Sequence, residues 1–295
     1  MDHQLYRRAT GEYDVTFYFV FDWHREADWN FTDYRIPVTT FWYILEGSRL
    51  LIASGEQHEL KPGMLVALPT NTSISTTYGR QDKAPIHYLS MGIQAIAGGL
   101  DWTERYGIPI AMQAFPRHEP RELTRIWHKL KEEAPMFRQI LSEGAETFVS
   151  AAHAGFALAW ESKLKMWLSL MTQAMLPYMT TPNPVIDRRV SDICTYIRRN
   201  YARKLQADEL ARQAALSEGH MRAVFRQVMG MSPHQYILQT RIEKAKELLA
   251  ASGLSLASIA ELTGFEDLSH FVQMFRKREG VTPAAYRKRL GAWEG

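Results

Sequence analysis

The sequence predicts an α+β protein with a strand-rich N-terminal half and an all-helical C-terminal part. Residues 13–93 contain short runs of β-branched and aromatic residues between turn signals, whereas apolar residues recur at helical spacing from about residue 121. Residue types in the last hundred residues also repeat at an offset of about fifty, which indicates a duplicated supersecondary unit. The two parts are therefore expected to differ in architecture and in task.

Composition excludes several classes of protein. The 295 residues are 46% apolar and 23% charged, as in an ordinary soluble protein. The single cysteine, Cys194, excludes a disulfide framework and a thiolate zinc cluster. The sequence shows neither a charged-then-apolar leader nor an apolar run long enough for a bilayer, so we expect a cytoplasmic chain without a membrane partner.

Charge is distributed unevenly along the chain. Residues 186–295 contain 18 Lys and Arg against 12 Asp and Glu, a net charge of +6. Residues 1–185 contain 17 against 20, a net charge of −3, and together the two parts account for the overall +3. A basic C-terminal part favours a nucleic-acid partner for that part alone.

The N-terminal half is predicted to form short strands that turn signals rich in Gly and Pro separate. The predicted strands are Tyr13–Val20, Thr39–Glu46, Leu50–Ser54, Met64–Leu68, Ser73–Tyr78 and Ile86–Met91. Many short strands at close spacing predict a sandwich or a small barrel.

Residues 116–179 are predicted to be helical. A first helix near Leu123 is expected to end at Pro135. A longer pattern from Glu146 carries an apolar stripe of Trp160, Leu164, Trp167, Leu168, Met171 and Met175. The stripe either packs on the barrel or joins two chains, because Trp and Met are enriched at interfaces. Residues 180–185 contain two prolines and are expected to be the domain linker.

Residues 186–295 are predicted to be helical throughout, with Ser217, Ser255 and Asp267 as N-caps. Ser232-Pro233 and Thr282-Pro283 start two further helices. A short helix twice precedes a longer one: Asp208–Gln213 before Glu218–Val228, and Leu256–Leu262 before Leu268–Arg278. Such pairs form helix-turn-helix units, whose second helix lies in the major groove of DNA.

The resemblance to a known family rests on the second unit and its copy. Residues 259–271, continued by Phe275-Arg276, Gly280, Thr282-Pro283 and Tyr286-Arg287, resemble the signature of the AraC/XylS family of bacterial transcription regulators. Leu210-Ala211, Leu216-Ser217, Phe225-Arg226, Gly230 and Ser232-Pro233 match the preceding half. The resemblance covers about residues 186–290 and implies seven helices with two helix-turn-helix units on double-stranded DNA. It also favours an activator, with a repressor as the open alternative, and RNA polymerase and a second copy of the chain as partners.

The resemblance places base-reading positions on both recognition helices. They are Glu218, Gly219, His220, Arg222 and Ala223 in the first unit, and Leu268, Ser269, His270 and Gln273 in the second. Arg222 suits guanine and Gln273 suits adenine, whereas Arg226 and Arg276 suit phosphates. For each of these residues the alternative is a solvated surface side chain. Because Gly219 and Ala223 are short, we expect the first unit to rely on Arg222 and His220.

Residues 13–95 resemble a small cupin barrel, on Tyr43–Gly47, Lys61–Gly63 and Met64–Pro69. The resemblance implies that residues 1–115 form a cupin-like ligand-sensing barrel, with ligand-facing positions at Trp42, Glu46, Thr76, Tyr78 and His87. An aromatic face with a few hydrogen-bonding groups favours a saccharide effector. A fatty acid or an aromatic compound is the alternative effector, and a ligand-free protein-interaction module is the alternative role. At each position, ordinary barrel core also stays open.

Metal-dependent catalysis is not expected in this barrel. Catalytic cupins hold their metal with a His-x-His pair, a Glu and a later His, and no His-x-His occurs in residues 1–185. His58 stands alone and is expected to be a surface strand residue. The sequence therefore predicts no enzyme activity, no metal and no cofactor.

Overall fold

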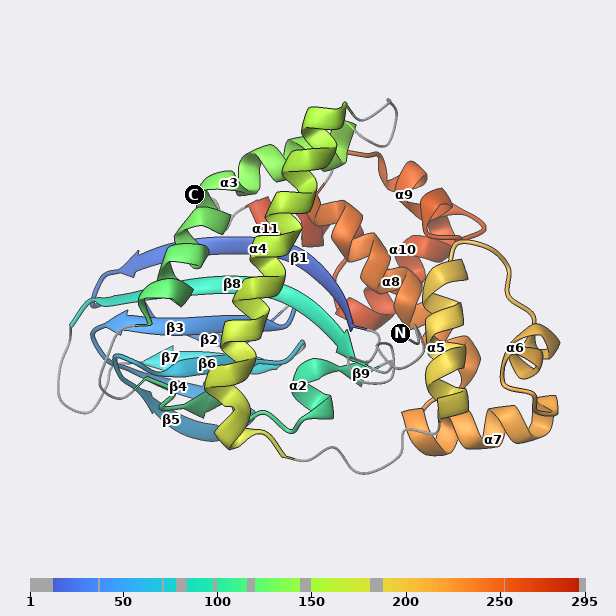
Figure 1. Cartoon of the computed structure of the whole chain (residues 1–295), viewed down its shortest axis with the longest axis horizontal. Coiled ribbons are helices and arrows are strands. Elements are labelled where there is room, and N and C mark those ends of the chain that lie inside the picture. Colours follow the sequence, from blue (N-terminus) through green and yellow to red (C-terminus); the bar gives the residue numbers. More distant parts are fainter. Residues whose placement is uncertain are drawn as a thin grey trace, which may run out of the picture. The chain divides into compact units, whose positions relative to one another are not determined.

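The computed structural model describes residues 13–291 except 37, 71, 78–83, 98–99, 116–119, 144–149, 181–187 and 252. The chain divides into two compact units, one strand-rich and one helical, which confirms the predicted α+β class (Figure 1). The strand-rich unit contains Val15–Gln94 and Thr103–Thr181. The helical unit contains Pro182–Gly295, and Ala95–Trp102 groups with it.

The described strands form two sheets. The first has the order β1-β8-β3-β6-β10, with β9 beside β8, and the second has the order β2-β7-β4-β5. Their bounds are β1 Tyr13–Arg25, β2 Phe31–Arg35, β3 Thr40–Glu46, β4 Arg49–Ala53, β5 Glu56–Leu60, β6 Leu65–Leu68, β7 Ser73–Thr77, β8 Ile86–Ala97, β9 Leu100–Asp101 and β10 Ala111–Met112. The pairs whose register is determined are antiparallel.

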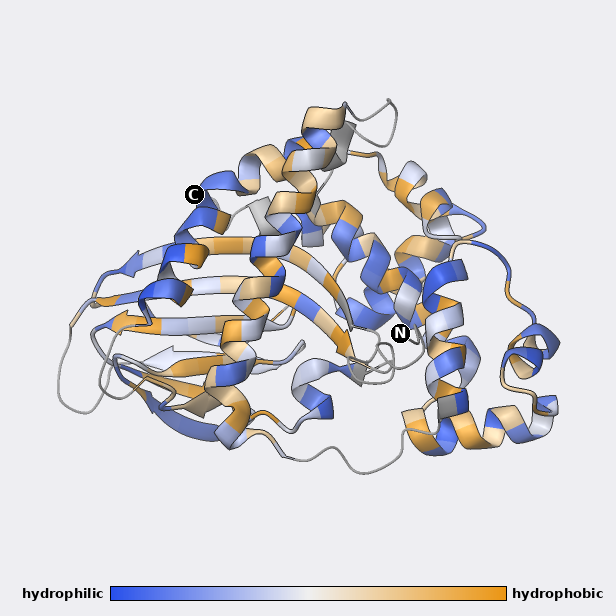
Figure 2. Ribbon diagram, in the orientation of Figure 1, coloured by the Kyte–Doolittle hydropathy of each residue, from blue (hydrophilic) through white to orange (hydrophobic). Residues whose placement is uncertain are grey.

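Side chains from both sheets meet in one apolar core, as the prediction of a sandwich or small barrel requires. Its buried members are Ile36, Trp42, Ile44, Leu51, Ala53, Leu60, Val66, Leu68, Ile74, Ile86 and Tyr88. Long hydrophobic stretches in β1 and β8 are visible in Figure 2. Because side chains alternate along a strand, the strand residues between two of these buried core residues point away from the core.

Sequence reasoning missed four of the described strands: β2, β5 and the two-residue strands β9 and β10. β2 and β5 stand at the edges of the second sheet, where one side of the strand has no neighbour among the described strands. Most β5 side chains are exposed, and its sequence Glu-Gln-His-Glu-Leu is polar. An edge strand needs little apolar content, so its composition resembles that of a turn.

Helices α3 (Arg121–Glu143) and α4 (Ala151–Met175) pack on each other beside the first sheet (Figure 1), with the short α2 (Trp102–Arg105) and a 3₁₀ turn at Leu176–Tyr178 nearby in the chain. The prediction that Pro135 ends the first helix was wrong, since Pro135 lies inside α3. Its ring is exposed, and Phe137 after it stacks on Trp160 at 3.9 Å between ring centroids. Packing on α4 therefore outweighs the one lost backbone hydrogen bond.

The apolar stripe of α4 faces inward within a single chain. Trp160, Leu164, Trp167, Met171 and Met175 are all buried. Trp167 meets Phe41 of β3 at 5.8 Å and Trp127 of α3 at 5.1 Å between centroids. Of the two interpretations of the stripe, packing is the correct one, because these side chains are not available to a second chain.

Seven described helices make up the rest of the helical unit. They are α5 Arg188–Asn200, α6 Ala207–Gln213, α7 Glu218–Met229, α8 Pro233–Ala251, α9 Leu256–Leu262, α10 Leu268–Glu279 and α11 Pro283–Gly291. The predicted caps are present: Ser217, Ser255 and Asp267 each accept a backbone N–H three residues on. The linker prediction for residues 180–185 falls almost entirely outside the described residues.

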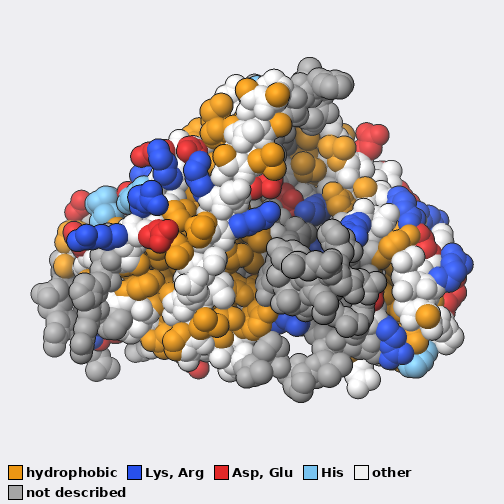
Figure 3. Space-filling view, in the orientation of Figure 1, with side chains coloured by type: hydrophobic (Ala, Val, Ile, Leu, Met, Phe, Trp, Pro, Cys, Tyr) orange, Lys and Arg blue, Asp and Glu red, His pale blue; other side chains and the backbone are white. Residues whose placement is uncertain are grey.

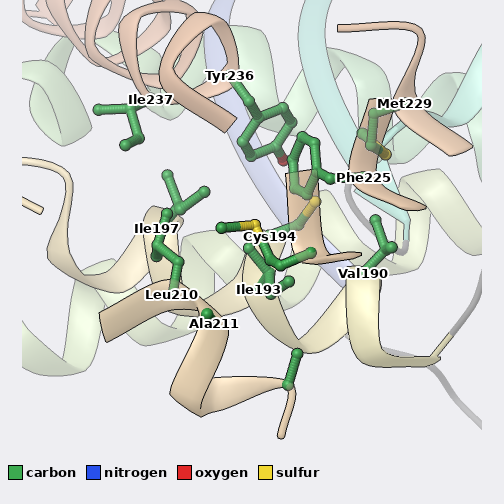
Figure 4. Close-up of a cluster of buried hydrophobic side chains, with 12 residues drawn as sticks. Val190, Ile193, Cys194, Ile197, Leu210, Ala211, Phe225, Met229, Tyr236 and Ile237 are labelled. Carbon is green, nitrogen blue, oxygen red and sulfur yellow. The ribbon is translucent and has the colours of Figure 1, made fainter. Parts of the chain in front are cut away.

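Helix α8 connects two separate apolar cores. Its first turn gives Tyr236 and Ile237 to a core with α5, α6 and α7, which also holds the buried Cys194 (Figure 4). Further along, Ile242, Ala245 and Leu249 join a core with α9, α10 and α11. One continuous helix thus fixes the separation of the two halves. Among the described residues, no helix is long and apolar enough to cross a membrane.

Candidate nucleic-acid interface

Helices α7 and α10 are built alike. Ser217 and Asp267 cap their first turns, and Gly230 and Gly280 end them with φ values of 67° and 73°. Glycine adopts this left-handed backbone without strain, so both helices stop at a defined residue. The inner faces are fixed by Met221, Phe225 and Met229 in α7, and by Phe271 and Phe275 in α10.

The residues expected to contact DNA lie on the outer faces of these helices. All of them are exposed: Glu218, Gly219, His220, Arg222, Ala223 and Arg226 on α7, and Leu268, Ser269, His270, Gln273 and Arg276 on α10. Exposed Leu268, with 42% of its surface accessible, is the unusual member, because large apolar side chains are costly to leave in water. The structure therefore brings the predicted residues of each unit onto one accessible helix face.

The turns before the two helices correspond residue by residue. Leu216 N–H donates to Ala211 C=O at 3.0 Å, and Phe265 N–H donates to Ala260 C=O at 2.9 Å. The residue before each donor has positive φ, 52° at Ala215 and 79° at Gly264. Ala211 and Ala260 are buried, as expected for small residues where two helices cross.

The supporting helix α6 is held by a carboxylate. Glu209 accepts hydrogen bonds from the Arg203 guanidinium and from the Tyr196 hydroxyl, and Arg203 Nη2 also donates to Tyr196 at 2.7 Å. The hydrogen bonds from Arg203 and then Tyr196 lower the pKa of Glu209 to about 2. The end of α5 and the start of α6 are thereby tied together.

The polar side of α8 anchors the unit further. Arg241 Nε donates to the Tyr201 carbonyl at 2.8 Å, and its Nη2 donates to the Arg203 carbonyl at 3.1 Å. Arg198 and Glu243 join α5 to α8 at 3.5 Å, and both side chains are almost buried. These contacts set the orientation of α8 against the first helix-turn-helix unit.

The two helix-turn-helix units have counterparts in known proteins. Residues 210–289, from α6 into α11, match a family model described as a helix-turn-helix domain. Residues of this chain are 37% identical over 95 residues to the probable transcriptional regulator LumQ of Photobacterium leiognathi, covering 32% of this chain and 38% of LumQ. They are 30% identical over 125 residues to the arabinose operon regulatory protein of Salmonella typhimurium, covering 41% and 44%.

Residues 210–289 are therefore similar to the helix-turn-helix domain of AraC-type transcriptional regulators. The match spans less than half of the length of these relatives. A solved structure, the DNA-binding domain of AdpA in complex with a target DNA, is 26% identical and covers 35% of this chain and 94% of that one, with a TM-score of 0.34. The residues matched by the family model, 210–289, lie in the helical unit and include both α7 and α10.

The predicted ligand positions of the strand-rich unit are only partly brought together. Trp42 and Thr76 are buried on the inner sides of β3 and β7, and Thr76 is paired in register with core residue Leu51. Glu46 is exposed after a register shift in β3. Tyr78 lies outside the described residues.

The prediction that His87 faces the ligand with Trp42 was wrong. Its neighbours Ile86 and Tyr88 belong to the inner core, so His87 points to the outer face of β8. There its Nε2 lies 2.7 Å from Asp22 Oδ1. The cause is the alternation of side chains along β8: the even-numbered Ile86 and Tyr88 face the core, so His87 between them faces outward.

Inner residues that sequence reasoning missed include Tyr88, Trp29 and Arg25. Tyr88 meets Trp42 at 5.0 Å and Trp29 at 5.8 Å between ring centroids. The Arg25 guanidinium lies 3.8 Å above the Trp23 ring. Burial raises the pKa of Tyr88, so its hydroxyl stays protonated. A period-two reading of β1 and β8 would have found Arg25 and Tyr88, whereas Trp29 lies between β1 and β2.

Proposed function

We propose that the chain is a DNA-binding transcriptional regulator, not an enzyme, whose two recognition helices occupy adjacent major-groove segments. The observation that carries the proposal is the matched pair α7 and α10, each capped alike and exposed along its predicted DNA face. Both are held by cores that share α8. A rigid pair of recognition helices suits a fixed spacing on DNA.

Base reading is proposed for Arg222, His220 and Gln273, with Arg226 and Arg276 on phosphates. The Arg222 guanidinium lies 3.2 Å from Glu218 Oε2 in the first two turns of α7. Both side chains are about half exposed, so the pair contributes little to stability and can open when a base competes. The freed Glu218 carboxylate can then accept a hydrogen bond from a cytosine amino group. Alternatively, it weakens binding to other sites by repelling the DNA phosphates.

Direct DNA binding is tested with the purified chain and a library of random duplexes. Selection should enrich one sequence class, and its binding should weaken steeply as salt rises because Lys and Arg displace condensed counterions. If no sequence is enriched, or if binding does not depend on salt, the proposal of sequence-specific DNA binding is contradicted. A variant with Phe275→Ala, which empties the core of α10, serves as the control that loses the second unit.

Effector control is proposed for the strand-rich unit. A saccharide is the first candidate, because Trp42, Tyr88 and Trp29 form an aromatic group and the buried Thr76 hydroxyl has no partner among the described residues. Arg25 favours an acidic or aromatic effector as the second candidate, since its guanidinium can pair with a carboxylate.

A thermal-shift screen separates these candidates. Sugars, fatty acids and small aromatic acids are each added to the purified chain, and the expected result is a rise of Tm with one class only. Thr76→Val should reduce the shift by a sugar, and Arg25→Met should reduce the shift by an acid. No shift with any class would favour the alternative of a protein-interaction module.

Dimerisation is proposed through the exposed side of α4. Leu158 and Met166 are 66% and 50% exposed, and Ala151, Gly155 and Ser162 lie on the same side at helical spacing. Small residues beside apolar ones allow two helices to approach closely. Leu158→Glu is expected to lower the molar mass measured by light scattering to that of one chain. We also propose that the DNA-bound chain activates transcription through contact with RNA polymerase.

A further inference from the structure

Four side chains that can bind metal gather on the outer surface of the strand-rich unit. Asp22 and His24 come from β1, His87 from β8 and His128 from α3. We call this group the Asp22 cluster. Asp22 and His24 stand two residues apart, so both lie on one face of the strand. Figure 3 shows His side chains beside Lys and Arg over the end of β1 and α3.

The donor atoms of the cluster are close to one another. Ligand atoms of Asp22, His24 and His87 all lie within 4.8 Å. His87 Nε2 is 2.7 Å from Asp22 Oδ1, and His128 Nδ1 is 3.8 Å from Asp22 Oδ2. Ligand atoms of a tetrahedral zinc ion are separated by roughly 3.4 Å, given bonds near 2.1 Å. The ligand atoms of Asp22, His24 and His87 are therefore close enough for one ion after small side-chain rotations, and His128 lies next to Asp22 Oδ2.

The partly buried Asp22 carboxylate is the anionic group of the cluster. Asp22 keeps only 15% of its side chain accessible, and Lys131 Nζ lies 3.3 Å from its Oδ2. The carboxylate is thus already paired with a positive group, which a bound metal ion would displace.

The imidazole rings of His24 and His87 lie against each other, with centroids 3.7 Å apart and planes inclined at 24°. The two rings therefore lie close together beside the Asp22 carboxylate, and imidazole nitrogen is a preferred ligand of zinc.

We propose that Asp22, His24, His87 and His128 bind one Zn²⁺ ion. Three imidazoles with one carboxylate select zinc over Mg²⁺ and Ca²⁺, which prefer oxygen ligands. The ion would join α3 to β1 and β8. Its role is structural, because it uses all four protein ligands and leaves no open coordination position. The site lies on the outer face, apart from the inner aromatic group proposed for the effector.

The test uses the untagged full chain after removal of metal. Titration calorimetry with Zn²⁺ should give one equivalent per chain, and Co²⁺ should produce the visible absorption of a tetrahedral complex. The double variant His24→Ala, His87→Ala should bind at least about 100-fold more weakly, since even loss of an outer partner of a metal ligand typically costs 10–100-fold. His58→Ala is the matched control and should bind as the parent does, because this partly buried histidine lies on β5, at the edge of the second sheet.

Two further variants test Zn²⁺ binding independently of the double histidine variant. Asp22→Asn preserves side-chain shape and should weaken Zn²⁺ binding even if the double variant fails to fold. Lys131→Met removes the competing ammonium and should strengthen it. Absence of stoichiometric binding, or equal affinity of the parent, the double variant and Asp22→Asn, would overturn the zinc site.

Discussion

The ammonium of Lys246 lies 3.0 Å from the carboxylate of Glu279, and the two side chains are only 4% and 6% exposed. Lys246 belongs to the connecting helix α8, and Glu279 is the last residue of the recognition helix α10. The pair therefore fixes the C-terminal end of α10 on α8, next to the Gly280 cap. A buried ion pair of this kind specifies geometry more than it adds stability.

Loss of one partner of this pair should be costly. Lys246→Met leaves the Glu279 carboxylate buried and unpaired, so the free energy of unfolding is expected to fall by about 3 kcal/mol. Urea denaturation of the parent and the variant measures the change. The double variant Lys246→Met, Glu279→Leu should recover most of the loss, and a double variant as unstable as the single one would show that the charge is not the cause.

The corresponding turn residues Ala215 and Gly264 should respond in opposite directions. Ala215 holds a positive φ that suits glycine, so Ala215→Gly is expected to stabilise the chain by about 0.5 kcal/mol. At Gly264 an added Cβ would lie 2.4 Å from the Ala202 carbonyl oxygen, so Gly264→Ala should destabilise by about 2–4 kcal/mol. Thermal unfolding compares them, and equal effects of the two changes would contradict the correspondence.

Acid should weaken the first helix-turn-helix unit through Glu209. Its pKa falls from 4.5 to about 2 on folding, because Arg203 and Tyr196 donate to its ionised form. The stabilisation is therefore complete above pH 4.5 and is lost as the pH falls from 4.5 toward 2. Glu209→Gln should be less stable than the parent at pH 7, and the difference should shrink below pH 4.5. A constant difference across this range would exclude the linkage.

Arg222 and Arg226 stand four residues apart on α7 and should give different phenotypes on DNA. Arg222→Ala and Gln273→Ala are each expected to weaken the selected site by about 1–3 kcal/mol and to relax preference at one base. Arg226→Ala should weaken all sequences alike and reduce the salt dependence by about one counterion. Competition binding with single-base variants distinguishes these outcomes, and uniform weakening by Arg222→Ala would assign it to phosphate.

The helical unit was largely predictable from the sequence because its signals are local. Ser217 and Asp267 cap helices, and Gly230 and Gly280 end them, whatever their distant neighbours are. Pro135 was misread because the stacking of Phe137 on Trp160 joins residues from two helices. His87 was misplaced because its face depends on the phase of β8, which only the partner strands set. The Asp22 cluster was invisible for the same reason, since its members come from three separate elements.

The central claim is that α7 and α10 read DNA together from a fixed separation. Hydroxyl-radical footprinting of the selected site measures this most directly. The account predicts two protected segments roughly 10 bp apart on one face of the duplex. It also predicts that Gln273→Ala weakens only one of them. A single protected segment, or two on opposite faces, would contradict the account.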